Sequence, residues 1–117
     1  IAQNLTTYVT NLIYSNQSNA TKQQFGDDAL LLNDEEFLWY FADSIVESIQ
    51  YGGRTELCSL LTYHYASYQD LWNAVVKFVT SSNDPRDYGS HFLTDITPGE
   101  GGRQWNWQCC SEFGWWQ

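Results

Sequence analysis

The sequence predicts one mainly α-helical domain whose C-terminal third is irregular and rich in turns. Apolar residues recur at helical spacing within the first 82 residues, and recognisable helix starts precede two of these segments. Residues 83–104 instead carry Gly, Pro, Asn and Asp at short intervals, which predicts a loop. An aromatic segment follows over residues 105–117. The 117 residues therefore form one domain, or a fragment of one, with a modest core.

The first predicted helix runs from Gln3 to about Ser15. Its apolar residues fall on one face at α-helical spacing. They are Leu5, Tyr8, Val9, Leu12 and Ile13. Residues 16–20 are polar and predict a loop suited to carrying glycans.

The clearest helix start lies at Asn33. Asparagine is a preferred N-cap, Glu36 stands three residues on, and acidic residues occupy the first turn. The apolar stripe that follows consists of Phe37, Leu38, Phe41, Ile45 and Ile49. Gly52 and Gly53 are typical of a helix end, so the helix stops there.

Two shorter helical segments follow. One begins near Thr55 and continues through Leu61, and the second begins after Ser67, which is a suitable N-cap. The apolar stripe of the second consists of Leu71, Val75, Phe78 and Val79. Pro85 ends it, because the residue before a proline avoids the helical conformation. The periodicity of residues 105–117 does not decide between strand and helix.

The charge of the chain limits its partners. Fourteen acidic residues against five basic ones give a formal net charge of −9. Such a surface repels nucleic acids and anionic membranes, and no apolar run has the length of a membrane span. We therefore expect neither a nucleic-acid partner nor a membrane-spanning segment.

Three glycosylation sequons lie within the first 21 residues, at Asn4, Asn16 and Asn19. Together with three cysteines they favour an oxidising, secretory environment, so we expect a secreted, extracellular or lysosomal/vacuolar protein. An odd number of cysteines leaves one that is free or paired outside the chain. The final fifteen residues hold four of the six Trp, which is unusual for a terminus, and we expect the chain to be a piece of a larger protein.

Two stretches resemble one family of serine peptidases. The first is Trp-x-x-Gln-x-Cys-Ser-Glu-Phe-Gly-Trp-Trp-Gln over residues 105–117. The second spans residues 25–58, with Phe-Gly, Asp-Glu-Glu-Phe-Leu-Trp-Tyr-Phe-Ala-Asp and Gln-Tyr-Gly-Gly-Arg-Thr-Glu-Leu-Cys in order. Both are similar to motifs of the family that includes lysosomal Pro-X carboxypeptidase, dipeptidyl peptidase II and thymus-specific serine protease. They cover about half of the chain.

The resemblance implies a helical cap (lid) domain of the kind inserted in an α/β-hydrolase fold. It also implies a parent hydrolase in which Ser attacks a peptide bond after proline, His acts as base and backbone amides form the oxyanion hole. This chain has no Gly-x-Ser-x-Gly elbow, so we expect no catalytic residue in it; the nucleophile would precede Ile1, and the Asp and His would follow Gln117. The expected partners are the remainder of the parent or companion chains, and through them a peptide substrate.

The same resemblance nominates residues of the substrate cleft. Gln108 and Glu112 fall in the family segment that runs near the cleft, where a carboxylate could meet a substrate amino group. Without the resemblance, Glu112 would be read as an exposed carboxylate. Trp105 is either a core residue or one of the flat apolar walls that suit proline.

The cysteines leave several pairings open. By resemblance, Cys110 occupies the family's cysteine position and bridges to a residue upstream of this chain, while Cys109 stands where the family usually has Thr. A Cys58–Cys109 or Cys58–Cys110 bridge is the alternative. Adjacent cysteines and the two His lack zinc-ligand spacing, so we expect no metal and no cofactor.

Two further expectations remain open. Asp43 lies within the apolar pattern of its helix, which predicts a salt bridge or a cap to a neighbouring loop, with Arg54 as one candidate partner. The competing functional class is a non-catalytic, glycosylated extracellular module used for binding or assembly, in which the aromatic tail would form an interface.

Overall fold

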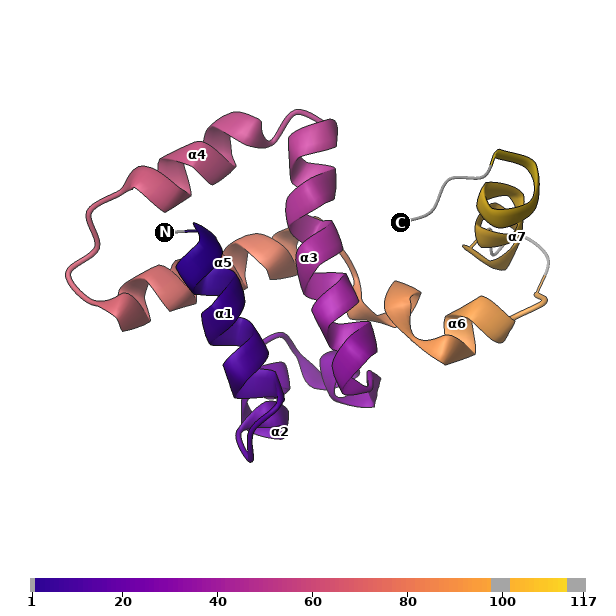
Figure 1. Cartoon of the computed structure of the whole chain (residues 1–117), viewed down its shortest axis with the longest axis horizontal. Helices are drawn as coiled ribbons and strands as arrows, with labels where there is room; N and C mark the ends of the chain where they lie inside the picture. The colour runs from indigo at the N-terminus through magenta and orange to yellow at the C-terminus, as the bar shows by residue number, and fades with distance from the viewer. Residues whose placement is uncertain (1, 98–101, 114–117) are drawn as a thin grey trace.

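A computed structural model describes residues 2–97 and 102–113. Within them the domain is mainly α-helical and contains no strand. The elements are α1 (Ala2–Ile13), α2 (Ser18–Gln23), η1 (Asp27–Leu31), α3 (Asp34–Gln50), α4 (Arg54–Thr62), α5 (Tyr68–Ser82), η2 (Pro85–Tyr88), α6 (Ser90–Thr94), α7 (Gly102–Gln108) and η3 (Cys109–Phe113, a π-helical turn). Figure 1 shows α1, α3 and α5 gathered in the body of the molecule, with α6 leading away from it to α7. No described helix is long and apolar enough to cross a membrane.

The core lies where α1, α3 and α5 meet around Phe25. The Phe25 ring packs edge-on against Phe37 and Trp72, with centroid distances of 5.1 and 5.8 Å. Trp72 is buried, and its Nε1 donates a hydrogen bond of 2.7 Å to Oε1 of Gln24. Each such buried side chain stabilises the fold by about 1.5–3 kcal/mol. The aromatic residues of the chain therefore provide much of its core.

The predicted helix starts at Asn33 and Ser67 are confirmed. The side chain of Asn33 accepts a hydrogen bond from the amide of Glu36, and Glu36 accepts one from the amide of Asn33, both at 2.9 Å. Ser67 caps α5 by accepting from the amide of Asp70 at 3.1 Å. At the other end of α3, Gly52 has a φ of 99°, a left-handed conformation that suits glycine. Capping chemistry thus sets the boundaries of the two longest helices.

Residues 16–20, expected to form a loop, include the start of α2. This helix has only six residues and would not be stable by itself in water. Contacts with the start of α3 and the residues before it hold α2 in place: Ser18 donates to Asp34 at 2.8 Å, and the buried Lys22 donates to the carbonyl of Leu32 at 2.9 Å. Tertiary contacts therefore hold these residues in a helix, although their polar composition favours a loop.

The predicted loop over residues 83–104 also differs, because it contains η2, α6 and the start of α7. The side chain of Asp84 caps η2 by accepting from the amide of Arg86 at 3.0 Å, and Pro85 occupies the first turn. Tyr88 is buried, with its ring 5.0 Å from that of Trp39. Pro85 and Gly89 therefore mark the starts of two short helices, η2 and α6.

The aromatic segment is helical over the part that the structure describes, in α7 and η3. Trp105 and Trp107 are 49% and 62% exposed, so neither belongs to the core formed by the described residues. Their helix contacts α6 and η3 and lies beside the body of the molecule (Figure 1). Trp115 and Trp116 of the same aromatic segment fall outside the described residues.

Candidate functional site

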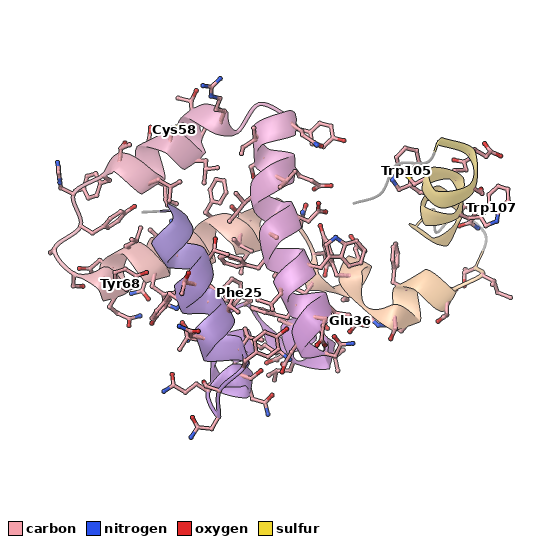
Figure 2. All side chains as sticks on the ribbon, in the orientation of Figure 1. Phe25, Glu36, Cys58, Tyr68, Trp105 and Trp107 are labelled. Atoms are coloured by element: carbon pink, nitrogen blue, oxygen red, sulfur yellow. The ribbon has the colours of Figure 1, made fainter. Side chains whose placement is uncertain are left out.

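A cavity of about 450 Å³, here called the α3–α7 cleft, lies between the outer face of α3 and Trp105 of α7. Figure 2 shows Trp105 on the side of α7 that faces α3, whereas Trp107 is on the opposite side. The lining residues are Trp39, Ala42, Asp43, Val46, Glu47, Gln50, Tyr51 and Trp105. They combine aromatic rings with two carboxylates.

The period of the α-helix explains why α3 supplies almost the whole lining. Trp39, Asp43 and Glu47 follow one another at intervals of four residues, so they form one row along the helix. Phe37 and Tyr40 lie on another face and are buried in the core. One helix therefore stabilises the fold with one face and presents a polar and aromatic surface with another.

A hydrogen-bonded chain holds Asp43 in place. The Tyr88 hydroxyl donates to Oδ2 of Asp43 at 2.9 Å and accepts from Nδ2 of Asn83 at 2.7 Å. Burial, and next the hydrogen bond to Asp43, raises the pKa of Tyr88 well above its usual value, so its hydroxyl stays a donor. Asp43 was expected to contact a neighbouring segment, and its partner there is Tyr88.

The expected ion pair between Asp43 and Arg54 is not formed. The ion pairs among the described residues join Lys22 to Asp34 and Arg86 to Asp28 and Asp84. None of them includes a carboxylate of the α3–α7 cleft. The acidic pair of the cleft, Asp43 and Glu47, therefore has no cationic side chain against it in the described parts of the chain.

The three cleft candidates suggested by the family resemblance are not brought together. Trp105 lines the α3–α7 cleft, whereas Gln108 lines a different cavity of about 410 Å³ with Ile96, Gln104 and Trp107. Glu112 is exposed in η3. Of the three, only Trp105 faces the row of polar and aromatic residues on α3.

The remaining site candidates do not line the α3–α7 cleft. Cys58 is an exposed free thiol on α4, and Cys109 is a buried free thiol in η3. The Cys58–Cys109 bridge is therefore not formed here. The side chain of Cys110 is not among those that the structure describes. Asn16 and Asn19 are exposed, and the side chain of Asn4 is not described. In the ranges the structure covers, no group of His, Cys, Asp and Glu could hold a metal ion.

Sequence reasoning did not nominate the lining residues Trp39, Glu47 and Tyr51. It also missed Tyr88, which holds Asp43. The four-residue spacing of Trp39, Asp43 and Glu47 was a usable signal, since it predicts a row on one side of a helix. Nothing in the sequence indicated that Tyr88, 45 residues after Asp43, would contact it. A pairing of that kind follows from the tertiary structure alone.

Comparison of the chain with protein-family models, with curated proteins and with solved structures finds no match.

Proposed function

We propose that this chain is part of the helical cap of a secreted or lysosomal serine-type exopeptidase, similar to Pro-X carboxypeptidase and dipeptidyl peptidase II. In this role it shapes and shields the substrate cleft. One observation carries the proposal: residues from both motif-bearing stretches line one cavity. Asp43 and Tyr51 come from the stretch 25–58, Trp105 comes from the stretch 105–117, and all three line the α3–α7 cleft.

The chemistry of this cleft fits the role of a wall. Its aromatic rings offer flat apolar surfaces of the kind that accommodate a proline ring, and its carboxylates offer a few oriented polar groups. The catalytic Ser, His and Asp belong to the remainder of the parent protein. The cap contributes shape, exclusion of water and part of the specificity.

A serine-reactive phosphonate probe tests the proposal on native material. Protein containing this sequence is purified by an antibody against it, labelled with the probe, and analysed by mass spectrometry. We expect the labelled Ser in the same protein or in a companion chain that copurifies, together with cleavage of peptides after proline. The isolated 117-residue chain provides the control, and it should remain unlabelled.

A matched pair of variants in the native protein examines the cleft itself. Trp105→Ala should raise KM for peptides with proline before the scissile bond, because a wall of the cleft is lost. Trp107→Ala removes the same side chain from outside the cleft and should leave KM unchanged. Equal effects of both variants would contradict a cleft role for Trp105.

The exposed indoles also favour a second candidate, a non-catalytic glycosylated module for binding or assembly. Trp105 and Trp107 are 49% and 62% exposed, and aromatic residues of this kind are enriched at protein interfaces. Native material that binds a partner but contains no probe-reactive Ser and cleaves no peptide would support this module over the peptidase cap.

A further inference from the structure

We propose that the α3–α7 cleft binds a small organic cation, an ammonium group held between the carboxylates of Asp43 and Glu47. The alkyl part of the ligand lies against the rings of Trp39, Tyr51 and Trp105. This inference goes beyond the proposed function and does not depend on it, because it uses only groups that line the cleft.

Charge is the first argument. Asp43 and Glu47 are one helical turn apart, and like charges at this spacing repel one another. The cationic side chains that do form ion pairs in the described ranges, Lys22 and Arg86, pair with other carboxylates. A ligand ammonium would relieve this repulsion in a protein whose net charge is −9.

Geometry is the second argument, because Asp43 is oriented before any ligand arrives. Its Oδ2 accepts from Tyr88, which Asn83 holds in turn, and no hydrogen bond of the described residues uses Oδ1. A carboxylate has acceptor sites left after one hydrogen bond. Because the orientation is fixed beforehand, binding costs less ordering of the side chain.

The aromatic walls are the third argument. Tyr51 is 81% exposed and Trp105 about half exposed, although both rings have large apolar faces. The ring of Trp39 is held in place by its edge-to-face contact with Tyr88. Cations within about 6 Å of an aromatic face are attracted to it, and cages of such rings bind quaternary ammonium groups.

Size and polarity agree with a small ligand. A cavity of about 450 Å³ falls in the range of ordinary ligand pockets, roughly 300–1,000 Å³. The carboxylates favour a cation over an anion. The aromatic rings favour contact with the uncharged part of the ligand over contact with water. The ligand class is therefore an alkylammonium or quaternary ammonium compound.

The test is a titration of the full 117-residue chain followed by tryptophan fluorescence and calorimetry. Choline is the quaternary ammonium probe, and 3,3-dimethylbutan-1-ol is its neutral isostere. We expect saturable binding of choline that weakens with added salt, and binding of the neutral isostere weaker by about tenfold. Nα-acetyl-lysine amide and n-butylammonium form a second arm: preference for the first indicates a cation presented on a peptide, and preference for the second a free amine.

Variants separate binding from folding. Glu47→Gln breaks no hydrogen bond or ion pair of the described structure, so it should leave thermal unfolding unchanged and weaken choline binding by about tenfold. Asp43→Asn should weaken binding as well, whereas Glu56→Gln on α4 is the matched control and should not. Equal binding of choline and its isostere, or binding unaffected by both Glu47→Gln and Asp43→Asn, would overturn the proposal. Since no reactive Ser is involved, such a failure would be distinct from a failure of the peptidase proposal.

Discussion

The hydroxyl of Tyr88, from the short helix η2, donates a hydrogen bond of 2.9 Å to Oδ2 of Asp43 in α3. Asn83 donates to the same hydroxyl from the end of α5. One buried phenol therefore connects α3 with the junction between α5 and η2, and Tyr88 lies 45 residues after Asp43 in the sequence. It also keeps Asp43 in the orientation in which its carboxylate lines the α3–α7 cleft.

Tyr88→Phe tests this connection. The substitution keeps the ring, which packs against Trp39 and Tyr40, and removes the oxygen on which both Asp43 and Asn83 depend. Because two partly buried polar groups each lose a partner, we expect a loss of about 1–3 kcal/mol in the free energy of unfolding. Urea denaturation monitored by circular dichroism measures it. Unchanged stability would show that solvent replaces the hydroxyl at no cost.

Tyr40→Phe is the matched control and should behave differently. The Tyr40 side chain is fully buried, and its hydroxyl has no hydrogen-bond partner among the described groups. Removing an unpaired buried oxygen loses no internal hydrogen bond, so we expect stability to be unchanged or to rise by about 1 kcal/mol. A clear destabilisation by Tyr40→Phe would reveal a partner for this hydroxyl.

The free energy of unfolding at alkaline pH is an independent test of the burial of the Tyr40 hydroxyl. Burial, and next the charge of Asp84, raises the pKa of Tyr40 to about 12. A raised pKa means that the unfolded chain loses this proton first. The contribution of Tyr40 is therefore complete below the ordinary tyrosine pKa of about 10 and is lost as the pH rises from there to about 12. Tyr40→Phe should make the loss of stability over that range shallower.

Much of the fold could be predicted from the sequence because local signals were strong where helices are long. Asn33 and Ser67 fixed two helix starts through their own side chains. In contrast, α2 and η2 depend on Lys22 and Tyr88, whose partners are distant or outside the element. Elements of four to six residues have too few local contacts to be recognised from periodicity.

The site was predictable only in part, for a related reason. The family motifs nominated Trp105, which lines the α3–α7 cleft, but also Gln108 and Glu112, which do not line it. Side chains at 105 and 108 are three residues apart on a short helix, and their surroundings depend on how α7 is placed against α3. A pattern of residues in one segment carries no information on that placement.

Native protein should carry glycan at Asn16 or Asn19. Both side chains are exposed, Asn16 in the turn after α1 and Asn19 in the first turn of α2, so glycans would extend into solvent there. Enzymatic deglycosylation of eukaryotic, secreted material should lower its mass and convert the modified Asn to Asp. The double variant Asn16→Gln, Asn19→Gln should lose that mass shift while unfolding at the same temperature. Unmodified Asn at both positions in such material would contradict a secretory origin.

Lys22→Met should destabilise the fold by removing the cation that joins α2 to α3. The Lys22 ammonium, 5% exposed, lies 2.7 Å from Oδ1 of Asp34 and also donates to the carbonyl of Leu32. The Asp34 side chain is 37% exposed, so the loss should fall between the about 1 kcal/mol of an exposed pair and the about 3 kcal/mol of a buried one. Lys77→Met, at an exposed position of α5, is the control and should be close to neutral. Equal effects of the two substitutions in urea denaturation would show that the pair contributes nothing.

Lowering the pH should weaken the ion pair between Lys22 and Asp34. Hydrogen bonds from Lys22 and then Ser18 hold the pKa of Asp34 below its ordinary value, so the folded chain binds this proton less readily than the unfolded chain does. The resulting stability is present above the ordinary aspartate pKa of about 4 and is lost as the pH falls through the lower, folded value. Asp34→Asn should therefore destabilise the protein at pH 7 and become indistinguishable from the unsubstituted chain at the lowest pH where both remain folded. A stability difference that stays constant from neutral to acidic pH would show that Asp34 acts as a neutral hydrogen-bond acceptor and not through its charge.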